Sequence, residues 1–401
     1  MFIDVSPLKN NEEFRKLFLG QTISFLGSMM TYVAIPYQAY AIKQDSFYVG
    51  LISSIQLIPL VLAGLYGGAL ADSADRRKLL LYSEWGLLLI SLLFVINSLL
   101  ANPSYILLCL LAAFSSALVG IHRPAMDALI PQIVDKKDLI SVSALGSLRY
   151  AIGAVTGPAL GGILISMYGA VATYLIDAFS FLISIYFIYR MKSLAKPSVT
   201  NKANLNSIIE GIQYAVKNPV LLGTYLVDII AMVFAMPMAL YPEIVHSINK
   251  KDLLGWLYAA IPLGAGFTSL FSGKFQLIRR HGAAVILAAT SWGFFIIGMG
   301  LTSNIYFMII CLFLAGAADN ISAIYRSTIW NESIPTEIRG RLGSLNMLSY
   351  MIGPLIGNLR AGTISSLTSP QFSILSGGIL CAIFCFASIW IFPTFWKYKE
   401  P

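Results

Sequence analysis

The chain has 401 residues, of which 57% are hydrophobic and only 11% are charged. This composition lies outside the usual range of water-soluble domains and excludes a soluble enzyme or a soluble nucleic-acid-binding module. The formal net charge of +8 is therefore attributed to membrane topology and contact with anionic lipid, and no nucleic-acid partner is predicted.

Apolar segments long enough to cross a bilayer recur from Phe14 to Phe395, separated by short polar breaks. A bilayer core needs roughly 20 apolar residues per helix. Scattered Gly and Pro suit membrane helices, and the short alternation typical of a β-barrel is missing from the sequence. We therefore predict an all-α membrane protein with twelve transmembrane helices, at approximately residues 14–42, 46–71, 79–100, 104–126, 139–167, 170–190, 219–244, 253–273, 283–302, 304–330, 341–366 and 371–395.

Lys and Arg are distributed unevenly over the predicted loops. With the N-terminus placed inside, twenty of the 27 fall in cytosolic segments, and only Lys43, Lys250 and Lys251 fall in external ones. Cytosolic loops of membrane proteins are enriched in Lys and Arg, so both termini are expected on the cytosolic side of a cell inner membrane.

The longest polar break, residues 191–218, contains an amphipathic run expected to lie along the inner interface. It separates an N-terminal bundle (1–190) from a C-terminal bundle (219–401), with six predicted helices in each. An internal repeat supports this division. Each half has an Arg followed by a Pro eight or nine residues later and, farther on, a Gly-Pro pair: Arg123 with Pro131, Arg326 with Pro335, Gly157-Pro158 and Gly353-Pro354. The two bundles are therefore predicted to be pseudo-symmetric.

The turn between the second and third predicted helices carries a recognisable pattern. Gly68-x-Leu70-Ala71-Asp72 followed by Arg76-Arg77-Lys78 resembles the signature of the major facilitator superfamily at this position. Further stretches are similar to the branch that contains macrolide efflux proteins and the enterobactin exporter: Arg123-Pro124-Ala125, Asp177-Ala178-Phe179-Ser180-Phe181 and Ile334-Pro335. The resemblance covers the whole chain and implies a major facilitator fold working by alternating access.

The same resemblance implies a cytosolic gate. Asp72 would face the start of the eleventh helix, whose N-terminal dipole attracts an anion, and Arg76 would reach Asp127 on the fourth helix. The remaining gating candidates lie near the cytosolic ends of helices 4, 10 and 11: Arg123, Arg326, Glu337, Arg339 and Arg341. Closing these contacts would hold the outward-facing state.

The fifth predicted helix carries small residues at close spacing, which let helix backbones approach, and a Pro that bends the span. The pattern is Gly153-x3-Gly157-Pro158-x2-Gly161-Gly162. It is similar to most of the antiporter motif of export members, with Ala144 where the first Gly would be. The motif favours export, while uptake by symport and generic helix packing are the alternatives.

Charged residues also fall inside the predicted spans, where a charge near the bilayer centre costs about 3 kcal/mol on insertion scales. Arg149 and Arg360 are candidates for binding an anionic or polar substrate, because a guanidinium offers forked donors. Asp228, Asp319 and Asp177 are candidates for proton coupling, because a buried carboxylate can take up and release a proton during transport. For all five residues, a structural ion pair or hydrogen bond is the alternative.

In the architecture of the superfamily, helices 1, 4, 7 and 10 line the central cavity, which implies that Asp228 and Asp319 face it. Aromatic candidates for the same cavity are Tyr32, Tyr37 and Tyr325, although helical aromatic residues are also common in cores. Glu84 and His122 are weaker candidates. A His can relay protons near neutral pH, but the sequence identifies no partner for His122.

The sequence contains no nucleotide-binding loop, catalytic constellation or metal-ligand spacing, so no enzyme, cofactor or metal is predicted. The four cysteines fall inside apolar spans and are expected to pack there. We predict a monomeric, proton-coupled secondary exporter of a siderophore-like or other amphipathic small molecule. Multidrug or macrolide efflux is an alternative, and a non-transporting membrane sensor or scaffold is an alternative of another class.

Overall fold

The computed structural model of the protein describes residues 4–192, 213, 214, 216–271, 273, 278–334 and 336–399, apart from the side chains of residues 69, 72 and 336–350. This part of the chain is helical. Ten helical segments in it are long and apolar enough to cross a membrane. The helices α11 (Leu254–Ser269) and α15 (Thr336–Leu367) occupy the positions of the eighth and eleventh expected spans. The all-α membrane fold is confirmed, and the described helices are consistent with twelve spans.

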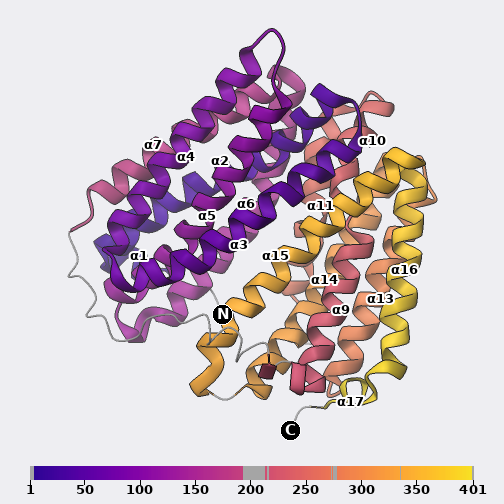
Figure 1. Cartoon of the computed structure of the whole chain (residues 1–401). Coiled ribbons are helices and arrows are strands. Elements are labelled where there is room, and N and C mark those ends of the chain that lie inside the picture. Colours follow the sequence, from indigo (N-terminus) through magenta and orange to yellow (C-terminus); the bar gives the residue numbers. More distant parts are fainter. Residues whose placement is uncertain are drawn as a thin grey trace. The chain divides into compact units, whose positions relative to one another are not determined.

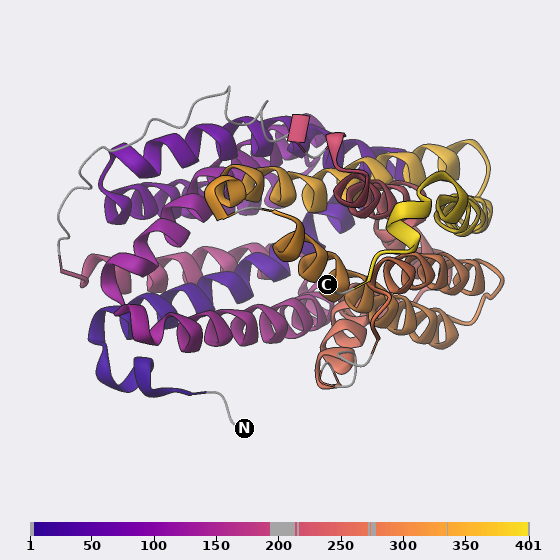
Figure 2. The same ribbon diagram turned by 90° about the horizontal axis from the view of Figure 1, so that it is seen from below.

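The chain divides into two compact units, the first formed by Met1–Lys43, Ile55–Ala203 and Lys250–Gly255. Within it, α2 packs against α7 and α6, while α4 packs against α7 and α5. Figure 2 shows these helices, coloured indigo to magenta, running alongside one another. The helices of unit 1 are α1 (Ser6–Asn10), α2 (Glu12–Lys43), α3 (Ser46–Ser73), α4 (Arg76–Leu99), α5 (Tyr105–Ile133), the one-turn η1 (Lys136–Asp138), α6 (Leu139–Tyr168) and α7 (Ala170–Tyr189). The start of α3, up to Ser54, belongs to unit 2.

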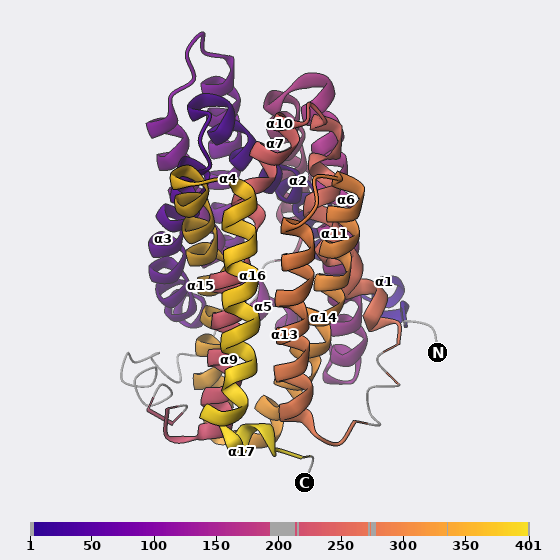
Figure 3. The same cartoon turned by 90° about the vertical axis from the view of Figure 1, so that its right-hand side faces the viewer.

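The second unit comprises Gln44–Ser54, Asn204–Asn249 and Trp256–Pro401. In it α13 packs against α14 and α16, and α9 packs against α15 and α16. These helices run side by side in Figure 1, and the adjacent α13 and α16 are clear in Figure 3. Besides α11 and α15, its elements are α9 (Pro219–Ala235), η2 (Met238–Leu240), α10 (Tyr241–Ser247), α13 (His281–Gly300), α14 (Ile305–Ser333), α16 (Pro370–Ile391) and α17 (Pro393–Trp396). The short 3-10 helix η3 (Lys251–Leu253) belongs to unit 1.

Helix boundaries follow local capping chemistry. The Asp75 side chain accepts a hydrogen bond from the backbone N–H of Lys78 and so caps α4. Ser104 caps α5 in the same way, and these caps satisfy backbone donors that the first helical turn leaves unpaired. Gly169, with a φ of 72°, separates α6 from α7. A left-handed conformation suits glycine, which has no Cβ to clash.

Two short segments cluster with the half of the chain that lies far from them in sequence. Gln44–Ser54 belongs to unit 2, where Ser46 and Ser365 both donate hydrogen bonds to the Glu243 carboxylate. Lys250–Gly255 belongs to unit 1, where Gly255 packs closely on the backbone of α6. Polar contacts therefore hold the start of α3. The start of α11 packs against α6 because Gly255 has no side chain to keep the two backbones apart.

The cysteines occur as free thiols. Cys109, Cys311, Cys381 and Cys385 are all buried. Cys381 and Cys385 are one turn apart on α16, with their Sγ atoms 3.9 Å apart. The described residues contain no group of His, Cys, Asp and Glu that could hold a metal ion.

Close packing between α13 and α16 rests on two glycines. A Cβ added at Gly293 would lie 2.8 Å from the backbone N of Ala382 and 3.0 Å from the carbonyl oxygen of Gly378. Gly293→Ala should therefore lower the free energy of unfolding by about 1–3 kcal/mol, because the two backbones must separate. Denaturation of the purified protein in mixed micelles measures the change.

The matched control is Gly146→Ala on α6. A Cβ added there meets no heavy atom within 4 Å, and alanine is the better helix former, so stability should stay the same or rise by up to about 1 kcal/mol. Equal effects of the two substitutions would contradict the close approach of α13 and α16.

Candidate functional site

One cation lies between two carboxylates inside unit 2. Arg326 of α14 forms an ion pair through Nη1 with Oδ1 of Asp228 on α9. Its Nη2 lies 3.5 Å from Oδ1 of Asp319, also on α14. We call these three residues the charge triad. With all three groups ionised, the triad carries one net negative charge.

The members of the charge triad differ in exposure. The side chains of Arg326 and Asp228 are 11% and 5% exposed, whereas that of Asp319 is 33% exposed. Asp319 and Arg326 are seven residues apart, which places them on one face of α14 two turns from each other. Asp228 reaches the same guanidinium from α9. Asp319 is thus the more exposed carboxylate, and Asp228 is the buried one.

The charge triad joins residues to which the sequence assigned different roles. Asp228 and Asp319 are proton-coupling candidates, and Arg326 is a gating candidate. The seven-residue spacing of Asp319 and Arg326 was visible in the sequence, but their common partner on α9 was not. Tyr325, next to Arg326, is buried, and its ring centroid lies 5.2 Å from that of His281.

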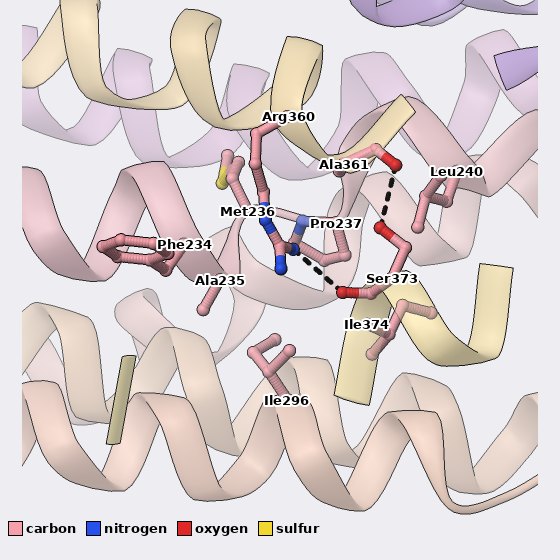
Figure 4. Close-up of a pocket in the computed structure, with 10 residues that line it drawn as sticks. All are labelled: Phe234, Ala235, Met236, Pro237, Leu240, Ile296, Arg360, Ala361, Ser373 and Ile374. Atoms are coloured by element: carbon pink, nitrogen blue, oxygen red, sulfur yellow. Dashed lines mark hydrogen bonds between the residues drawn. The ribbon is translucent and has the colours of Figure 1, made fainter. Parts of the chain in front are cut away.

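Arg360 directs its guanidinium at α16. Its Nη1 donates to the carbonyl oxygen of Ser373 at 2.9 Å, and its Nη2 donates to Oγ of Ser376 at 2.9 Å. Figure 4 shows the surrounding pocket, in which Ser373 also donates to the Ala361 carbonyl. The pocket is otherwise lined mainly by apolar side chains, including Phe234 and Ile296. The donors of Arg360 therefore connect α15 to α16.

Arg149, in unit 1, has weaker partners. Its two terminal nitrogens lie 4.0 and 3.9 Å from the sulfur of Met126. Its Nε is buried and has no hydrogen-bond partner among the residues that the structure describes. Asp127 and Arg123 act on it electrostatically. This guanidinium keeps donors that an oxygen-rich ligand can use.

Asp177 lies at the meeting point of α2, α4 and α7. It is 2% exposed and accepts hydrogen bonds from Thr31 at 2.6 Å, from Ser91 at 3.0 Å and from Ser28 at 3.5 Å. Hydroxyl donors from two helices therefore hold this carboxylate, an arrangement that suits a structural role. Its function in proton coupling stays a prediction.

The gating candidates are described in part. Arg76 donates through Nε to the Ala71 carbonyl at 2.9 Å and through Nη1 to the Ala128 carbonyl at 3.1 Å. Within the described residues it forms no ion pair with Asp127, which interacts instead with Arg123 and Arg149. The side chains of four candidates lie outside the part of the chain that the structure describes: Asp72, Glu337, Arg339 and Arg341.

The glycines of α6 face two different neighbours. A Cβ on Gly153 would meet Phe25 of α2, one on Gly157 would meet Met29, and one on Gly161 would lie 3.1 Å from Cα of Met30. Gly162 instead faces the backbone of Gly255, and Pro158 lies inside the helix.

The tyrosine candidates on α2 differ in exposure. The Tyr32 side chain is 44% exposed, whereas Tyr37 is partly buried. Their part in substrate binding stays a prediction.

Comparisons with known proteins identify relatives and structural neighbours. A sequence model of a family described as "Transmembrane secretion effector" matches residues 4–395. The enterobactin exporters EntS of Shigella boydii serotype 18 and of Escherichia coli O81 are each 27% identical over 380 residues, which is 94% of this chain and 91% of theirs.

Solved structures share the fold at low identity. A bacterial homologue of the iron transporter ferroportin in an inward-facing state matches with a TM-score of 0.74 and 14% identity, covering 96% of this chain and 98% of that one. A bacterial homologue of the human lysosomal transporter Spinster matches with a TM-score of 0.74 and 13% identity, covering 97% and 98%.

Proposed function

The chain belongs to the transmembrane secretion effector family of the major facilitator superfamily, and from that premise we propose that it is a secondary exporter driven by proton antiport. Its substrate is a siderophore-like or other amphipathic small molecule. The relatives named as enterobactin exporters support this substrate class. Two six-helix bundles, residues 1–190 and 219–401, alternate access to the substrate around the linker 191–218.

The observation that carries the mechanism is the unequal exposure of the charge triad. Arg326 keeps its charge at any physiological pH and holds Asp228 in a buried ion pair. Asp319 is the more exposed member, which supports it as the group that exchanges protons. A substrate hydroxyl donates a hydrogen bond to the ionised Asp319, and a proton on Asp319 removes that charged acceptor. Mutually exclusive binding of proton and substrate is the coupling that antiport requires.

Arg149 supplies the complementary half of recognition. Siderophore-like molecules carry oxygen acceptors as well as hydroxyl donors. The terminal nitrogens of Arg149 lie near a thioether, and its Nε has no hydrogen-bond partner among the described residues; these donors bind those oxygens. Arg360 is the second guanidinium proposed for the substrate, together with the tyrosines Tyr32, Tyr37 and Tyr325.

The proposal includes the topology and the gate. The protein works as a monomer in the inner membrane with both termini in the cytosol. Opening and closing of the cytosolic side involves Asp72, Arg76, Asp127, Arg123, Glu337, Arg339 and Arg341. The cations among them also suit contact with anionic lipid.

Transport by purified protein in proteoliposomes tests the function. A pH gradient imposed in each direction should move iron-free enterobactin opposite to the protons, and a protonophore should abolish the movement. Movement in the direction of the protons would establish symport, and movement of macrolides alone would establish drug efflux. Failure of every compound to move, with a partner protein co-purifying stoichiometrically, would establish a sensor or scaffold.

A further inference from the structure

A buried carboxylate in unit 1 lies against a histidine. Glu84 of α4 is fully buried, and its Oε1 lies 3.0 Å from Nε2 of His122 on α5. Gln21 of α2 donates to the same oxygen at 2.6 Å. The Gln21 amide also donates to Oγ of Ser184 on α7 at 3.1 Å. Four helices thus build this contact, although the two titratable residues are 38 positions apart in the sequence.

The second carboxylate oxygen of Glu84, Oε2, is buried and has no hydrogen-bond partner among the described residues. A carboxylate oxygen without a donor in a low-dielectric environment is costly while the group is charged. The His122 side chain is 15% exposed, so the pair combines a fully buried acid with a partly buried base.

The charged groups around the pair come from all four of these helices. On α7, Asp177 interacts with Glu84 electrostatically, and on α5, His122 interacts with Asp127, which Arg123 and Arg149 also face. On α2, Lys16 pairs with Glu12 and Glu13. On α4, Arg76 and Arg77 donate to backbone carbonyl groups. None of these cations forms an ion pair with Glu84 in the described part of the chain.

We propose that Glu84 and His122 share one exchangeable proton and form a second proton-binding site of the transporter, separate from the charge triad. With one proton the pair is neutral, either as carboxylate and imidazolium or as carboxylic acid and imidazole. Loss of the proton leaves a buried negative charge that faces a second carboxylate, Asp177. The proton enters or leaves through the imidazole, the more exposed member of the pair, and only an N–H or O–H bond forms or breaks.

The chemistry of the pair differs from that of the charge triad. Asp228 is neutralised by an arginine, which does not release its proton under physiological conditions. Glu84 is opposed by a histidine, whose ordinary titration range spans neutral pH. The Glu84–His122 pair can therefore change its charge by binding a proton, whereas the Asp228–Arg326 pair is a fixed ion pair.

Infrared difference spectroscopy of purified protein in nanodiscs, recorded between acid and alkaline pH, tests proton binding directly. In the wild type, proton binding should give either a carboxylic acid C=O component that is lost in Glu84→Gln or an imidazolium ring component that is lost in His122→Asn, depending on which partner holds the proton. A difference spectrum from which neither substitution removes a component would overturn the proposal.

A matched control is available in unit 2. Glu332 also lies near a histidine, with its Oε2 3.9 Å from Nδ1 of His281, but its side chain is 23% exposed and it accepts a hydrogen bond from the Tyr398 hydroxyl. Glu332→Gln should leave transport and the spectral component of the Glu84–His122 pair unchanged. Loss of that component in Glu332→Gln would show that it comes from Glu332 and His281, and would contradict the proposal.

The link to transport rests on the proposed function and has a separate measurement. In proteoliposomes, Glu84→Gln should reduce transport driven by a pH gradient at least about tenfold, while substrate counterflow without a gradient stays within about twofold. Retained counterflow also demonstrates that the variant is folded, and His122→Asn, at a partly exposed position, provides a second variant. Gradient-driven transport at the wild-type rate in both variants would contradict the role in coupling. A wild type that titrates without transporting would refute only the proposed function.

Discussion

Replacing Arg326 with methionine should lower the free energy of unfolding by about 3–5 kcal/mol, because the substitution leaves the buried Asp228 carboxylate without its ion-pair partner. Methionine keeps much of the apolar stem of the arginine side chain, so the decrease in the free energy of unfolding measures mainly the removal of the positive charge. Transport should be lost as well, because Asp319 loses the cation that positions it. Denaturation in mixed micelles and substrate counterflow in proteoliposomes measure the two effects.

Two variants separate charge pairing from simple loss of a side chain. The double variant Asp228→Asn/Arg326→Met removes both charges and should recover most of the lost stability, because no buried ion is left unpaired. Arg123, the repeat counterpart of Arg326, is exposed, and Arg123→Met should change stability by less than about 1 kcal/mol. A double variant as unstable as Arg326→Met would show that the Asp228–Arg326 pair does not account for the loss.

Asp319→Asn should uncouple substrate movement from the pH gradient. An amide has nearly the shape of the carboxylate but takes up no proton in this pH range, so proton and substrate no longer compete for one group. Gradient-driven transport should fall at least about tenfold, and substrate counterflow should continue with an affinity that no longer depends on pH. Transport rates measured with and without a pH gradient check both expectations.

Asp135→Asn is the matched control for this substitution. Asp135 pairs with Lys137, and both side chains are about three-quarters exposed, so their interaction is screened by water. Gradient-driven transport should be unaffected. If Asp319→Asn still transported at the wild-type rate under a gradient, the exchange of protons would have to occur elsewhere in the molecule.

The helical architecture was predictable because each spanning helix is recorded locally in the sequence as a run of apolar residues. The first expected span, 14–42, matches α2 at Glu12–Lys43, and the sixth, 170–190, matches α7 at Ala170–Tyr189. Several ends were predictable to within a few residues since polar caps such as Ser104 interrupt the apolar pattern. The fourth expected span, 104–126, ended too early, because α5 continues to Ile133, and the seventh, 219–244, missed the end of α9 at Ala235.

The partners of the buried charged residues were much harder to predict. They depend on which helix faces which, and the sequence gives no direct record of that. Arg360 was expected to be a substrate ligand or a member of an ion pair, yet its guanidinium meets a backbone carbonyl and a serine hydroxyl of α16. His122 had no recognisable partner in the sequence, because the acid that it meets lies on another helix. Only the spacing of Asp319 and Arg326 along one helix was a local signal.

The burial of the four native thiols makes the protein a convenient background for site-directed spectroscopy. A maleimide reagent reacts with the thiolate of an accessible cysteine, and thiols packed among apolar side chains react slowly. Cysteines introduced in pairs at exposed positions such as Lys137 and Tyr306 can therefore be labelled without first removing the native ones. Distances between spin labels, measured with and without substrate and at two pH values, would follow the transport cycle in the otherwise unmodified protein.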